Sequence, residues 1–161
     1  MSDSNAIAKL SPEKLIKNTR KIVQDKALNR DDKLQQISEL LADNVFSFDW
    51  VGFYLVDPEA ERELVLGPYV GEETDHTRIP FGTGICGQAA DTHETFVVQD
   101  VSEADNYLAC SVHVKAEVVV PIMKEGEFVA ELDIDSHTKN AITGEHRQML
   151  EEICEITAEI F

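Results

Sequence analysis

The stretch of sequence that decides the fold runs from residue 117 to residue 135 and reads EVVVPIMKEGEFVAELDID. Residues 117–123 and 128–134 are rich in β-branched and other apolar side chains, a composition typical of strands. Between them, Glu125-Gly126 is a turn signal of the kind that joins two antiparallel strands. The stretch therefore predicts a β-hairpin.

Three acidic residues occupy positions in this hairpin where strands usually carry Val or Ile. Glu117 opens the first strand, and Asp133 and Asp135 close the second. Asp133 and Asp135 are two residues apart, so their side chains share one face, with Leu132 and Ile134 on the other. Like charges side by side raise one another's pKa unless a cation or a hydrogen-bond donor lies between them. This pattern indicates a polar pocket for a small cationic group, although a strand end that turns into solvent explains it equally well.

The chain on either side of the hairpin alternates helical and strand-like patterns. Ser11 and Pro12 begin a first helix as N-cap and first helical residue, and Thr143 caps a last helix. The remaining expected elements are a helix from residue 31 or 32, strands at 48–56, 64–66 (ended by a break at Gly67-Pro68) and 96–98, a glycine turn at 81–84, a short helix at 85–91 and an irregular loop at 101–115. This order predicts an α+β fold with a mostly antiparallel sheet and the N-terminal and C-terminal helices packed on one face.

Composition limits the classes of function that are open. A chain of 161 residues with 43% hydrophobic residues is expected to form one domain, at residues 11–161, after a flexible N-terminus at residues 1–10. The formal net charge of −17 argues against nucleic acid and against anionic membranes as partners. The first residues have neither the basic nor the apolar region of a secretion signal, so we expect the protein in the cytoplasm.

Three cysteines in a cytoplasmic chain do not predict a disulfide scaffold, and their spacing does not match a zinc site. Cys110 lies in the irregular loop, where a thiol can be reactive or can simply fill space. Cys86 begins a helix, where the helix dipole favours a thiolate, although a small apolar residue against the sheet would look the same. Cys154 follows Leu150 by one helical turn, which favours a buried core position.

Two aromatic residues stand on one strand face with a glycine between them. Trp50 and Tyr54 flank Gly52 at alternate positions of the strand at 48–56. A glycine between two rings leaves a slot in which a small apolar group could lie. Core packing is the more common explanation of such aromatics.

Taken together, these residues resemble the free methionine-(R)-sulfoxide reductases, enzymes built on a single GAF domain. The resemblance covers the chain from about Phe48 to its C-terminus. The motifs that carry it are Asp49-Trp50-Val51-Gly52-Phe53-Tyr54, Ile79-Pro80-Phe81-Gly82-Thr83-Gly84-Ile85-Cys86-Gly87, Ala109-Cys110, Glu117-Val118-Val119-Val120-Pro121 and Leu132-Asp133-Ile134-Asp135-Ser136.

The resemblance assigns roles to these positions. It implies that Cys110 attacks the sulfur of free methionine sulfoxide and becomes a sulfenic acid, that a second thiol converts this to a disulfide, and that thioredoxin restores both thiols. The carboxyls of Glu117, Asp133 and Asp135 would hold the ammonium group of the substrate and protonate the sulfoxide oxygen. The apolar side of the pocket would be formed by Trp50 and Tyr54. No cofactor and no metal are expected.

The sequence departs from the family pattern in ways that leave alternatives open. Members with three thiols carry one ten residues before the position of Cys86, where this chain has His76, so Cys86 alone would resolve the sulfenic acid. The loop around Cys110 reads Asn106-Tyr107-Leu108-Ala109-Cys110-Ser111. The first alternative is therefore a GAF module that binds a small cationic or amino-acid ligand without reducing it. A metal site of Asp133, Asp135 and a histidine such as His137 is the weakest alternative, and a homodimer through the helices is the expected assembly.

Overall fold

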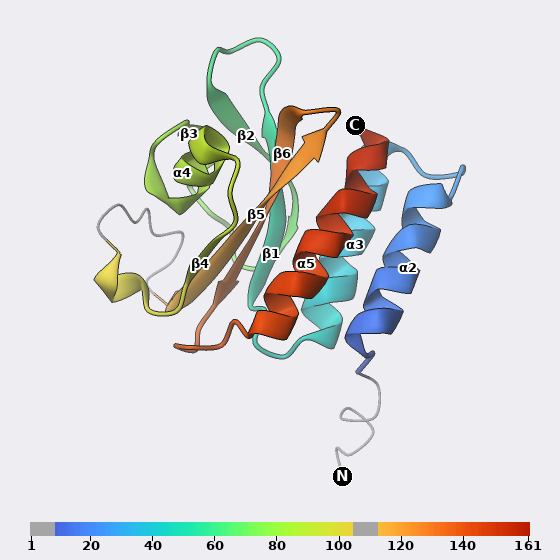
Figure 1. Cartoon of the computed structure of the whole chain (residues 1–161), viewed down its shortest axis with the longest axis horizontal. Helices are drawn as coiled ribbons and strands as arrows, with labels where there is room; N and C mark the ends of the chain where they lie inside the picture. Colours follow the sequence, from blue (N-terminus) through green and yellow to red (C-terminus); the bar gives the residue numbers. More distant parts are fainter. Residues whose placement is uncertain (1–8, 105–112) are drawn as a thin grey trace.

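The computed structural model describes residues 9–104 and 113–161 and shows a six-stranded antiparallel sheet with helices on both faces (Figure 1). The strand order is β3-β2-β1-β6-β5-β4, and every neighbouring pair is antiparallel. The elements are α2 (Pro12–Gln24), α3 (Arg30–Asn44), β1 (Trp50–Val56), β2 (Glu63–Val70), β3 (Arg78–Pro80), α4 (Gly84–Thr92), β4 (Phe96–Val98), η1 (Val101–Glu103), β5 (Ala116–Lys124), β6 (Glu127–Ser136), α5 (Gly144–Thr157) and η2 (Ala158–Ile160).

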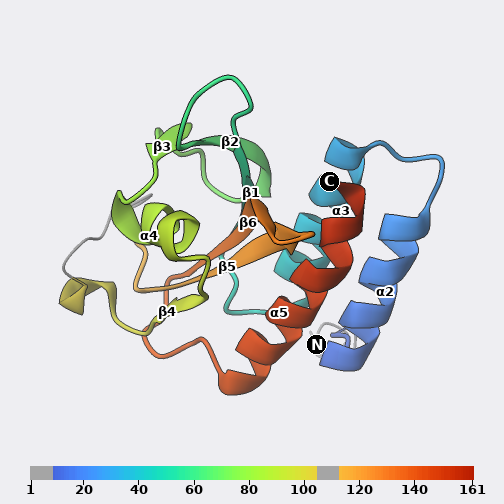
Figure 2. The same ribbon diagram turned by 45° about the horizontal axis from the view of Figure 1, so that its top comes forward.

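The helices divide unequally between the two faces of the sheet. Helices α3 and α5 lie against one face, α2 packs on α3 and α5, and α4 lies against the other face, over β5 and β6 (Figure 2). The α+β fold and the packing of the N-terminal and C-terminal helices on one face are thus confirmed. Residues 1–8, which hold most of the expected flexible N-terminus, lie outside the described residues.

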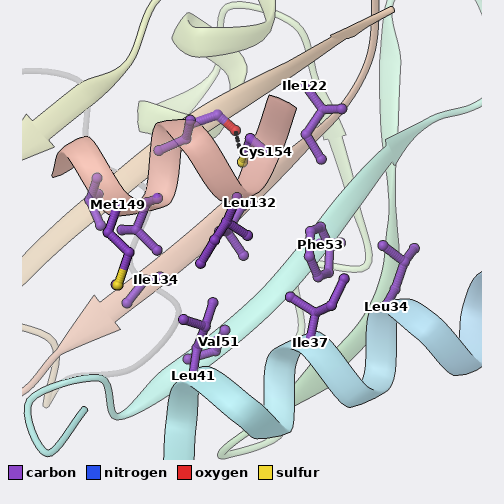
Figure 3. Close-up of a cluster of buried hydrophobic side chains, with 14 of the residues drawn as sticks. Leu34, Ile37, Leu41, Val51, Phe53, Ile122, Leu132, Ile134, Met149 and Cys154 are labelled. Carbon is purple, nitrogen blue, oxygen red and sulfur yellow. Dashed lines mark hydrogen bonds between the residues drawn. The ribbon is translucent and has the colours of Figure 1, made fainter. Parts of the chain in front are cut away.

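The main hydrophobic core fills the space between the sheet and the three helices. Val51, Phe53, Leu132 and Ile134 reach it from the two central strands (Figure 3). Leu34, Ile37 and Leu41 of α3, with Met149, Leu150 and Ile153 of α5, meet them from the helices. Residues at alternate strand positions supply this core, so the intervening residues of the same strands must face α4.

The hairpin predicted from the sequence forms, with longer strands than expected. Strands β5 and β6 pair from Ala116↔Ser136 to Lys124↔Glu127, and β6 pairs with β1 on its other side. Pro121 has no backbone N–H to donate. The pairing of β5 with β4 ends before Pro121, so this missing donor interrupts no hydrogen bonds between those two strands. The acidic segment of β6 therefore lies in the middle of the sheet.

Strand β2 shows where the sequence prediction was wrong. The expected break at Gly67-Pro68 does not end this strand, which continues to Val70. Its pairing with β1 shifts register between Gly52 and Tyr54, opposite these two residues. A bulge accommodates a proline because the ladder is already interrupted there.

The helix starts follow the capping logic of the sequence. The side chain of Ser11 accepts a hydrogen bond from the backbone of Lys14, and Pro12 is the first residue of α2. Thr143 and His146 form a reciprocal capping box at the start of α5. In the described part of the chain, no helix is long and apolar enough to cross a membrane.

Candidate functional site

The face of the sheet under α4 carries a row of buried acids. Glu131, Asp133 and Asp135 alternate along β6, and all three are at most 1% exposed. Glu117 of β5 is 3% exposed and pairs directly with Asp135. Four carboxyls therefore share one face of two neighbouring strands.

Glu131 is the residue of this row that the sequence prediction missed. It stands two residues before Asp133, on the same strand and the same face. The strand alternation that brought Asp133 and Asp135 together could have included it. The residue is fully buried and pairs with Tyr54 of β1 and Pro121 of β5.

Helix α4 covers the acids and brings a thiol to them. Cys86 is the third residue of α4 and is 5% exposed. The helix can begin so close to the sheet because the turn before it contains Gly82, with φ +89°, and because Gly87 has no side chain. A Cβ on Gly87 would lie 2.7 Å from the carbonyl oxygen of Pro80 and 2.9 Å from the backbone nitrogen of Gly82. The glycines of the predicted turn thus set the position of Cys86.

The thiol lies among the carboxyls. The Sγ atom of Cys86 is 3.9 Å from Oε2 of Glu117, at the long limit of a hydrogen bond from sulfur. Atoms of Cys86, Glu117 and Asp133 that can bind a cation all lie within 4.8 Å of one another. An organic ammonium group or another cation placed between them would compensate their negative charge.

Burial changes the protonation of this site. Removal from water raises the pKa of Glu131 well above its usual value, and the neighbouring charge of Asp133 raises it further. Burial also raises the pKa of Asp133, while Glu117 and the Cys86 thiol lower it in part. Among the described residues, no donor makes a hydrogen bond of ordinary geometry to the carboxylate oxygens of Glu131 or Asp133. The site can therefore keep a carboxylic acid protonated near neutral pH, as a proton donor requires.

The two aromatic residues of β1 anchor the segment between β2 and β3. The indole nitrogen of Trp50 donates to the carbonyl of Glu72 at 3.0 Å, and the hydroxyl of Tyr54 donates to the carbonyl of His76 at 2.8 Å. The rings of Trp50 and Tyr54 stack at 6.4 Å between centroids. They belong to a second apolar cluster, under α4, that also contains Cys86.

The slot predicted above Gly52 is not open. A Cβ at this position would lie 2.6 Å from the ring of Trp50 and 2.5 Å from the Cβ of Tyr69. The glycine is needed because the indole of Trp50 folds back across it and stacks on Tyr69 at 5.2 Å between centroids. An apolar group therefore cannot lie over Gly52, as the sequence had suggested.

The other predicted residues have different outcomes. Cys110, the expected nucleophile, lies outside the described residues. The core position of Cys154 is confirmed, and burial raises the pKa of its thiol. His137 does not join the acids of β6, because its backbone and ring turn to Asp49, with Nδ1 3.9 Å from Oδ2.

Known proteins share this fold and sequence pattern. Residues 29–160 match the model of the GAF domain family. The fold and this match define the class: the chain is a GAF domain protein.

Within that class, a curated free methionine-R-sulfoxide reductase from Escherichia coli strain K12 is 33% identical over 120 residues, 74% of this chain and 70% of the relative. GAF domain-containing protein A of Dictyostelium discoideum is 35% identical over 143 residues, 88% of this chain and 89% of the relative. An X-ray structure of free methionine-R-sulfoxide reductase from Neisseria meningitidis in complex with its substrate superposes with a TM-score of 0.87 at 34% identity, covering 100% of this chain and 92% of that one. The chain belongs to the free methionine-R-sulfoxide reductase family of GAF domain proteins.

Proposed function

We propose that this protein reduces free L-methionine-(R)-sulfoxide to methionine. The observation that carries the proposal is the buried cluster in which the thiol of Cys86 lies beside the carboxyls of Glu117 and Asp133. Membership of the reductase family supports the same reading. A redox thiol, a proton donor and an anionic pocket are what this reaction needs.

The carboxyls have two tasks in the proposed reaction. Those of Glu117, Asp133 and Asp135 lie on one face of the sheet and bind the ammonium group of a free amino acid, which a residue inside a protein chain does not have. A carboxyl kept protonated by burial donates its proton to the sulfoxide oxygen, which is a poor leaving group without it. The side chains of Trp50 and Tyr54 form the apolar wall beside the methyl-sulfur end of the substrate.

The thiols carry the electrons. In the proposal, Cys110 attacks the sulfoxide sulfur, methionine leaves, and the oxygen remains on Cys110 as a sulfenic acid. The thiol of Cys86 then displaces this oxygen as water and forms a Cys86–Cys110 disulfide. Thioredoxin, in the cytoplasm, reduces that disulfide and restores both thiols. The chain acts as a homodimer and needs no further cofactor in this scheme.

The activity is tested by incubating the pure, reduced protein with racemic free methionine sulfoxide and dithiothreitol, and following methionine by chiral chromatography. We expect consumption of the (R) epimer only, and no turnover in Cys110→Ser. Cys154→Ala is the matched control because this thiol lies on the far side of the sheet from the acids. Absence of methionine from the wild type, or undiminished turnover in Cys110→Ser, would exclude the proposal.

A second function is favoured by the surroundings of Cys86. The thiol of Cys86 is 5% exposed and lies beside the carboxyls of Glu117 and Asp133, where a reaction partner reaches it less easily than a surface thiol. This arrangement suits a GAF module that binds an amino-acid-like or cationic ligand without reducing it. Calorimetric binding of methionine or its sulfoxide, with both thiols unchanged by mass and no methionine formed from the sulfoxide, would select this alternative.

A further inference from the structure

Three buried polar side chains under α4 bring atoms that can bind a metal ion close together. The Sγ atom of Cys86 and one carboxylate oxygen each of Glu117 and Asp133 all lie within 4.8 Å of one another. These residues are 5%, 3% and 0% exposed. Neither carboxylate oxygen of Asp133 has a hydrogen-bond partner of ordinary geometry among the described residues. A buried carboxylate costs folding free energy unless a partner compensates it, so this cluster calls for a cation.

The three side chains are held by well-packed elements of the fold. Glu117 belongs to β5 and Asp133 to β6, and these two strands pair over their whole length. Cys86 is the third residue of α4, whose start is fixed by the close approach of Gly87 to the turn before it. A metal site needs ligands that are in position before the ion binds, and these elements supply them.

The mixture of ligand atoms points to a particular class of metal ion. Carboxylate oxygens alone would suit magnesium or calcium. The sulfur changes this preference, because a thiolate is a soft ligand and zinc is the common divalent ion that accepts both thiolate and carboxylate. The position of Cys86 in the first turn of α4 favours the thiolate form that a metal requires.

The spacing of the ligand atoms is close to that of a zinc site. In a tetrahedral site with a Zn–S distance of about 2.3 Å and a Zn–O distance of about 2.0 Å, the sulfur and an oxygen lie about 3.5 Å apart. In the structure, Sγ of Cys86 and Oε2 of Glu117 are 3.9 Å apart. These two atoms therefore need to approach by only a few tenths of an ångström to hold a zinc ion between them.

We propose that Cys86, Glu117 and Asp133 bind one zinc ion, with a water molecule as the fourth ligand. On binding, a sulfur–zinc bond replaces the S–H bond of Cys86, the thiol proton goes to the solvent, and no electrons are transferred. The ion compensates two of the three negative charges of its ligands and gives the buried Asp133 the partner that it lacks among the described residues.

The zinc ion would inhibit the proposed reaction. It occupies two carboxyls to which the proposed function assigns the ammonium group of the substrate, and it holds the thiol that resolves the sulfenic acid. Zinc and free methionine sulfoxide should therefore exclude each other from the site. This consequence rests on the proposed reductase function, whereas zinc binding itself does not.

The test uses cobalt(II), which substitutes for zinc and gives a sulfur-to-cobalt charge-transfer band when a thiolate binds it. Cobalt is added to the reduced, metal-free protein in the Cys110→Ser, Cys154→Ala background, in which Cys86 is the remaining thiol. We expect one cobalt per chain with this band, and its disappearance when one equivalent of zinc is added. Cobalt that binds without the band, or no binding of cobalt, would overturn the proposal.

The carboxyl ligand is tested in the same background. Asp133→Asn should weaken zinc binding by at least about tenfold, measured by competition with a chromophoric chelator. Glu127→Gln is the matched control, because Glu127 is an exposed acid at the start of the same strand. Equal zinc affinity in the two variants would overturn the site. If Asp133→Asn does not fold, X-ray absorption of zinc bound to the background protein decides: one sulfur at about 2.3 Å supports the site, and a shell without sulfur excludes it.

A single turnover separates this inference from the reductase proposal. Reduced wild-type protein is mixed with free methionine sulfoxide without any added reductant, because dithiothreitol itself binds zinc. With one equivalent of zinc, methionine release should be at least tenfold slower, and a chelator should restore it. Undiminished release from the zinc-loaded protein would overturn the inference. If the metal-free protein releases no methionine, the reductase proposal fails, while the cobalt and X-ray absorption measurements still decide whether the zinc site exists.

Discussion

The thiol of Cys86 lies 3.9 Å from the carboxyl of Glu117, although the two residues come from a helix and a strand 31 positions apart in sequence. The contact exists because α4 begins directly above the acid row of the sheet. A turn of glycines makes this close approach possible.

Replacement of Cys86 by serine should separate the first turnover from the following ones. Because Cys110 alone makes methionine in the proposed reaction, Cys86→Ser should release about one methionine per protein and then stop when thioredoxin is the reductant. Rapid-quench chromatography measures this burst. Steady turnover of Cys86→Ser with thioredoxin would show that another thiol resolves the sulfenic acid.

Gly87→Ala should displace α4 and with it Cys86. The added methyl group would lie 2.7 Å from the carbonyl oxygen of Pro80, which belongs to backbone that cannot move without shifting the turn. We expect a loss of about 1–3 kcal/mol in the free energy of unfolding, measured with urea, and a fall in turnover. Gly144→Ala is the matched control, because a Cβ there has no atom within 4 Å. Equal stability of the two variants would contradict the tight packing at the start of α4.

Tyr54→Phe removes the donor that holds the carbonyl of His76. The unsatisfied carbonyl should lower the free energy of unfolding by about 1 kcal/mol. If the segment between β2 and β3 helps to shape the pocket, the KM for free methionine sulfoxide should rise more than kcat falls. In Tyr69→Phe, whose hydroxyl donates to no described residue, neither quantity should change appreciably. A KM that stays constant in Tyr54→Phe would show that the hydrogen bond from Tyr54 to His76 does not contribute to substrate binding.

The stability of the protein should decrease as the pH rises from about 4.5 through the neutral range. Burial raises the pKa of Glu131 well above its ordinary value of 4.5, so the folded state binds a proton more tightly than the unfolded state. The contribution is complete below the unfolded pKa and is lost as the pH rises through the folded pKa. Glu131→Gln should therefore be more stable than the wild type at pH 8, by about 1–3 kcal/mol, and nearly equal to it at pH 4. Parallel pH profiles of the two proteins in urea denaturation would contradict a raised pKa.

Much of the fold could be predicted from the sequence because its signals are local. The hairpin at residues 117–135, the caps at Ser11 and Thr143 and the helical stripes each depend on neighbouring residues, and all appear in the structure. The failures involve pairing between distant strands. Gly67-Pro68 looked like a break, but the register shift opposite it in β1 accommodates the proline.

The candidate site was predictable in kind and less so in detail. Alternation along one strand placed Asp133 and Asp135 on one face, and in the structure Glu117 and Cys86 are buried on the same side of the sheet. Two details could not be predicted: the contact of Cys86 with Glu117, and the indole of Trp50 folded over Gly52. Both depend on how the helices and side chains of the folded protein pack together, which no local sequence pattern encodes. Glu131 was missed although the same alternation includes it.

The central claim is tested most directly by one turnover without reductant. The fully reduced protein is mixed with one equivalent of free methionine-(R)-sulfoxide, quenched, alkylated, digested and analysed by mass spectrometry, and the methionine released is measured from the same sample. We predict about one methionine per chain and a single disulfide between Cys86 and Cys110, with Cys154 alkylated only after unfolding. The account would be contradicted by protein that binds the sulfoxide yet keeps all three thiols reduced, or by methionine formed with Cys86 still free.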